Sequence, residues 1–351
     1  MSSQHSGDNS QLLALAEGLG WPFEVKPLTY RGHETLIRLV ALPSLSAVDG
    51  PSRERLAPPW PDLVISAGRA TEAVAQWIRA HANSPVRLVY VGTPWSPPDR
   101  FDLVIATPQY RLADHPRILQ NALPMHRVTP ERLAQALAQW SPRLAHVPRP
   151  LIAVLAGGPS GPYGFSAAAG RRLGEAVSRM ASEAGGSLLV STSARTPDEA
   201  ADALTAAISV PHHLHRVGAS EDDNPLFGYL AMADTLIVTA DSISMIAEAC
   251  ATGKPVLLFD TETGPRSMRA EETAGGLPPP HWRGANWSST MFRLAMRFAP
   301  APWSRDLRIV HRALIASGAA SWLDAPRPHR PLAPQADLDR AVRRIRSLFA
   351  A

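Results

Sequence analysis

The sequence predicts an α/β protein built from two Rossmann-like domains, and three features support this prediction. Short apolar runs recur along the chain, and each run ends in a small or polar turn. Stretches with helical periodicity follow several of these turns, which gives repeated β-turn-α-turn-β units of the kind that form parallel sheets with right-handed crossovers. The length of 351 residues favours two such domains.

The first domain is predicted over residues 1–145. Its expected strands are 63–65, 87–91 and 101–106, and its expected helices are 12–16, 71–80 and 131–140. Residues 141–150 hold three prolines and show little apolar periodicity. We therefore place the linker between the two domains in this segment.

The second domain is predicted over residues 146–351. Its expected strands are 151–155, 187–190, 235–238 and 256–259, and its expected helices include 166–183, 197–208, 244–250 and 307–317. Residues 262–304 break this rhythm and are predicted to be an insertion. The final helix, 337–349, is amphipathic with arginines opposite its apolar face, so we expect it to pack back on the first domain.

Composition excludes several classes of protein. The hydrophobic share of 45% and the charged share of 19% are those of a globular protein, and no run approaches the roughly 18–20 apolar residues of a membrane-spanning helix. The polar N-terminus lacks a secretory apolar region, and one cysteine cannot form an internal disulfide framework. These features predict a cytoplasmic protein.

The formal charge is +4, and nearly all of the positive charge is arginine. Because no run of basic residues with interleaved aromatics occurs, we expect no nucleic-acid partner. The charge instead favours an anionic substrate or a membrane surface. The cluster His212-His213-x-His215 lacks a carboxylate at ligand spacing, so we expect no metal site there.

The most informative stretch is 229–259, a strand, a polar turn, a helix and a second strand. Its turn lies at the carboxyl end of one strand and the amino end of a helix, where unpaired N–H groups and the helix dipole favour an anion. We therefore predict that Thr239, Ser242 and Ser244 contact a phosphate or a sugar. In the alternative interpretation, Ser242 or Asp241 only caps the helix.

Two further turns are predicted on the same edge. In the first, Gly157 and Gly158 would let the backbone approach a ligand closely, and the N–H groups up to Ser160 would cradle a pyrophosphate. In the second, Ser193 and Arg195 close a strand, and the guanidinium would neutralise a diphosphate. An ordinary glycine turn and a solvated arginine are the alternatives.

Long segments of the chain resemble the ELM (elongated mitochondria, mitochondrial fission) family, which has many bacterial members. They are GGPSGPYGFS at 157–166, SLLVSTSARTP at 187–197, DNPLFGYLAMADTLIVTADSISMIAEACATGKPV at 223–256, RIVHRALIASGAA at 308–320 and, in the first half, FDLVIATPQYRL at 101–112. The resemblance implies a GT-B arrangement of the two domains, with a nucleotide-sugar donor held mainly by the second domain. It also implies that Glu248 accepts hydrogen bonds from ribose hydroxyls and that Asn224 lies near the base pocket.

Three turns depart from the family pattern, and all lie on the presumed acceptor side, at residues 8–11, 93–95 and 107–110. A glycosyltransferase of the inverting type needs a general base near the acceptor hydroxyl. Asp8 is the first candidate for this catalytic role, and His126 is the second.

The sequence thus predicts a glycosyltransferase-like protein that binds a nucleoside-diphosphate sugar in the cleft between its domains, without a metal or a cofactor. A sugar-nucleotide epimerase and a non-catalytic scaffold are the alternatives, and the acceptor is not specified. The segment 291–298 is apolar with two arginines. It suggests a peripheral contact with the inner membrane as an alternative to a core helix or a lid.

Overall fold

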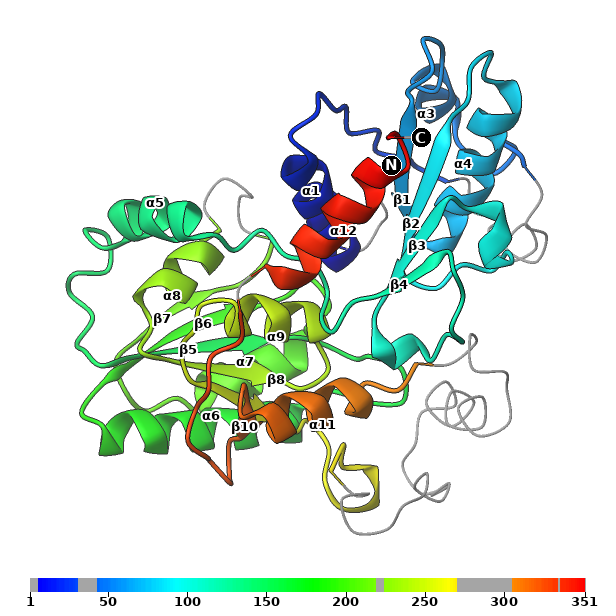
Figure 1. The fold of residues 1–351 in the computed structure, drawn as a ribbon. Coiled ribbons are helices and arrows are strands. Elements are labelled where there is room, and N and C mark those ends of the chain that lie inside the picture. The colour runs from blue at the N-terminus through cyan, green and yellow to red at the C-terminus, as the bar shows by residue number, and fades with distance from the viewer. Residues whose placement is uncertain (1–5, 31–42, 219–223, 270–304, 334, 351) are drawn as a thin grey trace. The chain divides into compact units, whose positions relative to one another are not determined.

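The structure is a computed structural model that describes residues 6–30, 43–218, 224–269, 305–333 and 335–350 (Figure 1). The chain forms two compact units. The first comprises Met1–Arg127 together with Gln335–Ala351, and the second comprises Val128–Pro334. Both units are built on parallel sheets with helices, so the prediction of two Rossmann-like α/β domains is confirmed.

The first unit has a four-stranded parallel sheet in the order β1-β2-β3-β4. Its strands are β1 (Leu63–Ala67), β2 (Arg87–Val91), β3 (Leu103–Ala106) and β4 (Ile118–Gln120), and its helices are α1 (Ser6–Leu19), α3 (Gly50–Glu54), α4 (Arg69–His81) and α12 (Ala336–Ser347). Successive side chains of a strand point to opposite faces. Val89 and Val91 therefore join the core beside α1, whereas Leu88 and Tyr90 join the core beside α4.

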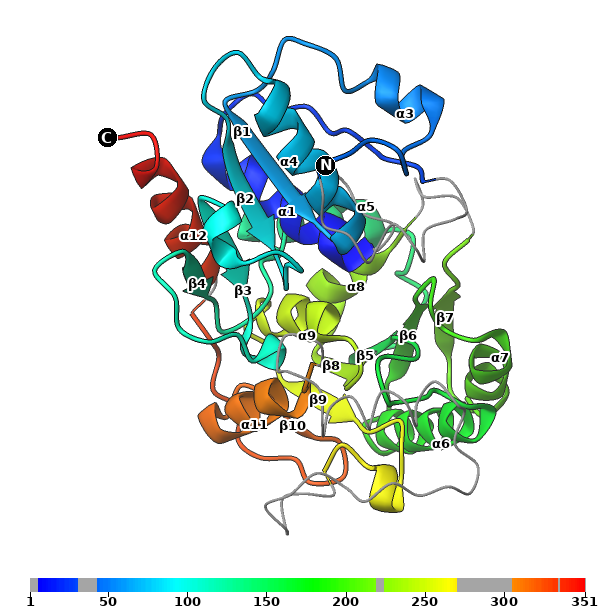
Figure 2. The ribbon, with the colours of Figure 1, turned by 90° about the vertical axis from the view of Figure 1, so that its right-hand side faces the viewer.

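Helix α12 belongs to the first unit although more than 300 residues separate it from α1 in the sequence. Leu338, Val342 and Ile345 on its buried face share a core with Leu12 and Leu15 of α1. Figures 1 and 2 both show the two helices side by side. The apolar stripe that makes the helix amphipathic is thus used within the fold.

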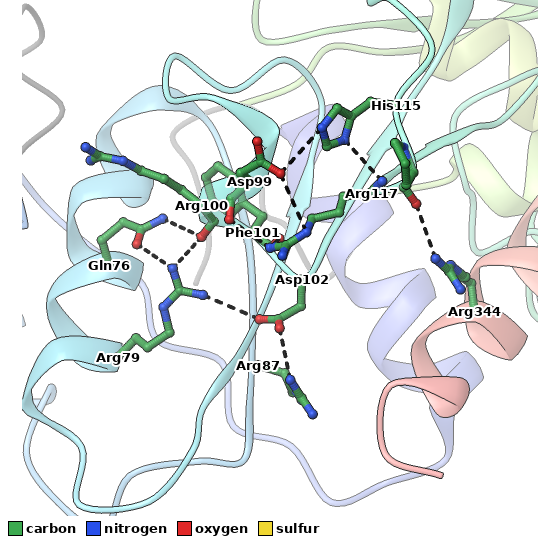
Figure 3. A network of polar contacts seen from close by, with 11 residues as sticks. Gln76, Arg79, Arg87, Asp99, Arg100, Phe101, Asp102, His115, Arg117 and Arg344 are labelled. Carbon is green, nitrogen blue, oxygen red and sulfur yellow. Dashed lines mark hydrogen bonds and ion pairs between the residues drawn. The ribbon is translucent and has the colours of Figure 1, made fainter. Parts of the chain in front are cut away.

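A network of polar contacts that includes several arginines lies at the amino ends of the strands of the first sheet (Figure 3). The carboxylate of Asp102 accepts a hydrogen bond from the backbone N–H of Leu88 at 2.8 Å and pairs with Arg87 at 3.2 Å and Arg79 at 3.5 Å. Burial lowers the pKa of the Arg79 guanidinium, and the charge of Asp102 opposes that shift. Part of the positive charge seen in the sequence therefore serves the fold.

The second unit has a six-stranded parallel sheet in the order β10-β9-β8-β5-β6-β7. Its strands are β5 (Leu151–Ala156), β6 (Ser187–Thr192), β7 (His212–His215), β8 (Thr235–Thr239), β9 (Val256–Phe259) and β10 (Ser321–Trp322). Its helices are α5 (Pro130–Trp140), α6 (Ala167–Glu183), α7 (Asp198–Ala206), α8 (Leu226–Met232), α9 (Ile243–Cys250) and α11 (Arg308–Ser317). The central strands are buried on both faces, which explains their continuous apolar runs.

The boundary between the units lies between Arg127 and Val128, whereas the sequence placed it in the proline-rich segment near residue 145. The difference arises because α5 packs on α8 of the second unit. The ring of Trp140 lies so close to Gly228 that a Cβ added there would be 2.5 Å from its Cγ. The prolines of 141–150 thus lie in the connection between α5 and β5, inside the second unit. Most of the predicted insertion, from residue 270 onward, lies outside the described residues.

Candidate functional site

The order of the second sheet creates a switch point between β5 and β8. From β5 the chain adds β6 and β7 on one side and then returns to add β8 and β9 on the other side. Ligands of open α/β sheets bind at such a point, outside the carboxyl ends of the strands. The turns that follow β5, β6, β8 and β9 meet at this edge, and we refer to them together as the carboxyl-edge turns. They are residues 157–160, 193–196, 239–242 and 260–262.

The turns after β5 and β8 are joined by two hydrogen bonds. The N–H of Gly157 donates to Thr239 Oγ1 at 2.7 Å, and the N–H of Gly158 donates to Asp241 Oδ2 at 2.8 Å. A Cβ on Gly157 would lie 2.2 Å from Asp241 Oδ2, and one on Gly158 would lie 2.1 Å from the carbonyl oxygen of Arg195. The two glycines therefore allow a close approach within the protein, and their N–H groups hold the switch point together.

The turn after β6 is tied to the same place by Thr196. Its hydroxyl lies 3.0 Å from the carbonyl oxygen of Ala156 and accepts a hydrogen bond from the N–H of Ser193 at 2.9 Å. The guanidinium of Arg195 donates to the carbonyl of Pro159 at 3.2 Å, and its second nitrogen lies 3.8 Å from the Asp241 carboxylate. Because its side chain remains 43% exposed, Arg195 is held at the edge yet open to solvent.

Asp241 is the most buried charge of the carboxyl-edge turns, with 1% of its side chain exposed. Burial raises the pKa of its carboxyl, although the Thr239 hydroxyl, the Gly158 N–H and Arg195 oppose the shift. Its second oxygen, Oδ1, makes no hydrogen bond to any described residue. Through its bond to Gly158, this aspartate fastens the end of β8 to the turn after β5.

Replacing Asp241 with asparagine is expected to remove a pH-dependent loss of stability. A raised native pKa means that the folded chain holds the proton more tightly, so ionisation destabilises it as the pH rises above about 3.8. The stability of Asp241→Asn relative to the wild type should therefore be greater at pH 8 than at pH 4, as measured by chemical unfolding. Asp202→Asn, at an exposed carboxylate of α7, is the control. An identical difference at both pH values would contradict the assignment.

The amino terminus of α9 is open, although a serine stands at its N-cap. The side chain of Ser242 makes no capping hydrogen bond, whereas Ser166 caps α6 through the N–H of Ala169 at 3.3 Å. Within the described chain, the N–H groups of residues 243–245 have no hydrogen-bond acceptor. Such groups, together with the helix dipole, favour an anion. The alternative in which Ser242 only caps the helix is therefore not what the structure shows.

Ser244 and Glu248 lie on one face of α9, because residues four apart are neighbours on a helix surface. Ser244 is half-buried in the first turn, and Glu248 is 8% exposed. The rise between them is about 6 Å along the helix axis. A ligand whose phosphate lay at the open helix end would thus extend toward the carboxylate of Glu248.

Ser160 and Asn224 are the remaining residues predicted to bind the nucleotide-sugar donor. Ser160 is buried, and its hydroxyl accepts a hydrogen bond from Arg305, a contact that the sequence did not indicate. Asn224 is exposed and accepts a hydrogen bond from the N–H of Leu226, the first residue of α8, at 3.0 Å. All residues predicted to bind the nucleotide-sugar donor therefore belong to the second unit: Gly157, Gly158, Ser160, Ser193, Arg195, Asn224, Thr239, Ser242, Ser244 and Glu248.

Helix α11 supports the turn after β8 from the far end of the sequence. The fully buried ring of His311 donates from Nε2 to the carbonyl of Ala240 at 2.7 Å, and its edge contacts Trp322. The helix begins at a buried ion pair in which the Arg308 guanidinium donates hydrogen bonds to both carboxylate oxygens of Asp306, each at 2.7 Å. Sequence reasoning missed these residues because nothing local links residues 306–311 to residue 240.

The two catalytic candidates, Asp8 and His126, belong to the first unit. Asp8 lies half-buried in the first turn of α1, and its charge contributes to the raised pKa of buried Tyr90, whose main cause is desolvation. His126 is half-buried near the end of the unit. Both roles stay predictions.

The departing turn at 93–95 is held by Glu72 of α4. Its carboxylate accepts hydrogen bonds from the N–H groups of Trp95 at 2.9 Å and Ser96 at 2.8 Å. The guanidinium of Arg69 stacks over the Trp95 ring at 4.3 Å from its centroid. Side chains of α4 therefore hold this turn in place.

Across residues 6–30, 43–218, 224–269, 305–333 and 335–350, no group of three or more histidine, cysteine or acidic side chains is arranged to hold a metal ion. His212, His213 and His215 lie on β7, where neighbouring side chains alternate between faces. In the same parts of the chain, every helix is too short or too polar to cross a bilayer.

Comparison with known proteins identifies a matching family and two relatives. A family model described as mitochondrial fission ELM1 matches residues 6–277. The mitochondrial fission protein ELM1 of Arabidopsis thaliana is 28% identical over 226 residues, which cover 58% of this chain and 52% of that protein. An uncharacterised protein of Rickettsia prowazekii (strain Madrid E), RP120, is 24% identical over 230 residues, 57% of this chain and 64% of that protein. The matches thus span only about half to two thirds of these relatives.

Among solved structures, the UDP-GlcNAc 2-epimerase from Methanocaldococcus jannaschii is similar with a TM-score of 0.43 and 12% sequence identity. The similarity covers 90% of this chain and 98% of that chain. A similarity this weak establishes no shared activity.

Proposed function

This chain belongs to the mitochondrial fission ELM1 family, and we propose that its second unit binds a nucleoside-diphosphate sugar at the carboxyl-edge turns. The observation that carries the proposal is the open amino terminus of α9 at the switch point of the sheet. Its uncapped N–H groups offer hydrogen bonds to an anion, and Arg195 adds an exposed cation beside them.

The arrangement along α9 favours a nucleotide over a simple phosphate. The diphosphate would lie at residues 242–244, with Arg195 on the β6 side. The carboxylate of Glu248 would accept hydrogen bonds from the ribose hydroxyls about one helical turn further along. The same geometry uses Thr239 and Asp241 to hold the turn, so they position the site without contacting the ligand.

The reaction we propose is transfer of the sugar to an acceptor, as in a GT-B glycosyltransferase, in a cytoplasmic protein that uses neither a metal nor a cofactor. Sugar-nucleotide epimerisation and a non-catalytic scaffold are the alternatives. Product analysis separates these three functions, because an epimerase converts the donor without an acceptor and a scaffold leaves it unchanged. A peripheral membrane contact through residues 291–298 stays a prediction, since that segment lies outside the described residues.

Calorimetric titration with UDP-, GDP-, ADP- and CMP-linked sugars tests the binding step. We expect saturable binding of at least one donor, and we expect Arg195→Ala to weaken it by about tenfold to a hundredfold, the usual contribution of a charged hydrogen bond.

The matched control is Arg216→Ala. Its side chain is 40% exposed and pairs with Asp202 at 2.7 Å, so it resembles Arg195 in exposure but lies away from α9. Glu248→Gln should weaken binding of a ribonucleotide more than binding of inorganic pyrophosphate. Failure of a folded wild-type protein to bind any of these donors would contradict the proposal.

A further inference from the structure

Four large apolar side chains gather on the surface of the first unit. Among the described residues, the exposed large hydrophobics are Trp21, Phe23, Val25, Leu137, Val217 and Phe349, with 37–52% of their surface accessible. Four of these, Trp21, Phe23, Val25 and Phe349, form what we call the apolar patch. Isolated exposed apolar residues are ordinary, but a group that includes three aromatic rings marks an interaction surface.

The patch is built where α1 and α12 end. Helix α1 stops at Leu19, Gly20 turns the chain with a φ of 67°, and residues 21–26 run without helix or strand pairing. Trp21 packs edge-on against Phe349, with ring centroids 5.1 Å apart. Arg346 of α12 donates to the carbonyl of Leu19 at 3.0 Å. The two ends are thus fastened together, and the rings are held outward instead of being folded into the core.

The three apolar residues of the segment 21–26 alternate with Pro22, Glu24 and Lys26. Residues 21–25 are all exposed, so Trp21, Phe23 and Val25 present three apolar side chains within one short surface segment. The buried face of α12 is already used against α1, so the patch is an addition to the amphipathic helix and not its core side.

The charge around the patch is positive. The last turns of α12 carry Arg343, Arg344 and Arg346, whereas its acidic residues, Asp337 and Asp339, lie in the first turn at the other end. Arg343 is exposed and has no hydrogen bond or ion pair with any described residue.

The acidic side chains near the patch are already paired. Glu24 pairs with Lys26 at 2.6 Å, and Glu17 pairs with Arg127 at 2.6 Å. Arginine side chains thus face outward beside the apolar patch without an excess of carboxylates to neutralise them.

We propose that the apolar patch docks on an anionic lipid bilayer. Tryptophan and phenylalanine prefer the boundary between head groups and acyl chains, where the ring is buried and the indole N–H stays hydrated. Arg343 and Arg346 would lie at the level of the lipid phosphates, and each basic residue near such a surface adds attraction. The patch would hold the protein at the surface of the membrane, independently of any nucleotide-sugar binding.

Flotation of the intact chain with phosphatidylcholine vesicles, with and without phosphatidylglycerol, tests the proposal. We expect the wild type to bind the anionic vesicles at least about tenfold better, and to be released by salt. The double variant Phe23→Ser/Val25→Ser should bind them about tenfold or more weakly, because two exposed apolar side chains are lost. Neither residue is in the core, so the fold should be retained.

Two matched controls exist. Leu137→Ser/Val217→Ser removes apolar side chains that are each 43% exposed in the second unit, and it should bind as the wild type does. Arg343→Glu should weaken binding to anionic vesicles about tenfold. Arg179→Glu, at an exposed arginine four residues before the end of α6, should not.

Three outcomes would overturn the proposal. The first is equal binding of the wild type to both kinds of vesicle. The second is unchanged binding by the patch variant. The third is a patch variant that abolishes self-association of the wild type, measured by light scattering, since that would assign the patch to a second copy of the chain.

Discussion

Between pH 7 and pH 4, the second unit is expected to lose about 3 kcal/mol of its free energy of unfolding through His311 alone. Burial lowers the pKa of this imidazole from 6.5 to about 4. The hydrogen bond to Ala240 and the charge of Asp306 oppose the shift but do not cancel it. Between pH 6.5 and pH 4, the unfolded chain therefore binds a proton on this ring, whereas the folded chain does not.

The sign of the effect follows from the depressed pKa. Well above pH 6.5 the ring is neutral in both states, and the full stability is present. As the pH falls toward 4, the unfolded state gains a proton and is stabilised relative to the native state. Protonation of the native ring would place a cation among Arg308 and Arg312 in a fully buried site.

Guanidinium unfolding at a series of pH values checks this expectation with His311→Gln. Glutamine can donate to the Ala240 carbonyl but does not titrate, so the variant should be less dependent on pH between 6.5 and 4 than the wild type. His212→Gln removes an exposed histidine from β7 of the same unit and serves as the control. If His311→Gln and the wild type have parallel pH profiles, the ring is not buried as described.

Replacing Gly158 with alanine is expected to lower the stability of the second unit by about 2–3 kcal/mol. The new Cβ would lie 2.1 Å from the carbonyl oxygen of Arg195 and 2.4 Å from its carbonyl carbon. These are backbone atoms of the turn after β6, which Thr196 and Ser193 hold in place. The turn must therefore shift, and this outweighs the smaller gain from reducing the entropy of the unfolded chain.

The control for this variant is Gly50→Ala. Gly50 begins α3, has no heavy atom within 4 Å of an added Cβ, and does not require a positive φ. It should leave the midpoint of chemical unfolding unchanged or raise it slightly. Equal midpoints for the two variants would mean that the turns after β5 and β6 are not packed as closely as the structure shows.

The elements of the fold could be predicted because their signals are local. Each buried strand is an apolar run that ends in a small or polar turn, and the strand cores 151–155, 187–190, 235–238 and 256–259 all recur in the structure. The turns were also placed at one edge from the sequence, since parallel strands end together. Short pairings such as β4 and β10 were missed, because two or three residues carry too little periodicity.

The purpose of individual residues was harder to predict. The glycines at 157–158 suggested an approach by a ligand, but the atoms that approach them belong to Asp241 and Arg195. Thr196 and His311 act through contacts with residues that are 39–71 positions away in sequence. The boundary near residue 145 rested on prolines, whereas the packing of Trp140 on Gly228 decides where α5 belongs. Spacing along the chain does not report such pairings.

Helix α12 has a consequence for the order in which the chain can fold. The second unit is a single continuous segment, Val128–Pro334, whereas the first unit needs residues from both sides of it. During synthesis the second sheet can assemble while α1 still lacks the helix that covers it. The core that Leu12, Leu15 and Leu19 of α1 share with the first sheet then stays incomplete until the last residues of α12 are made. The unit that begins the chain is thus the last to complete its core.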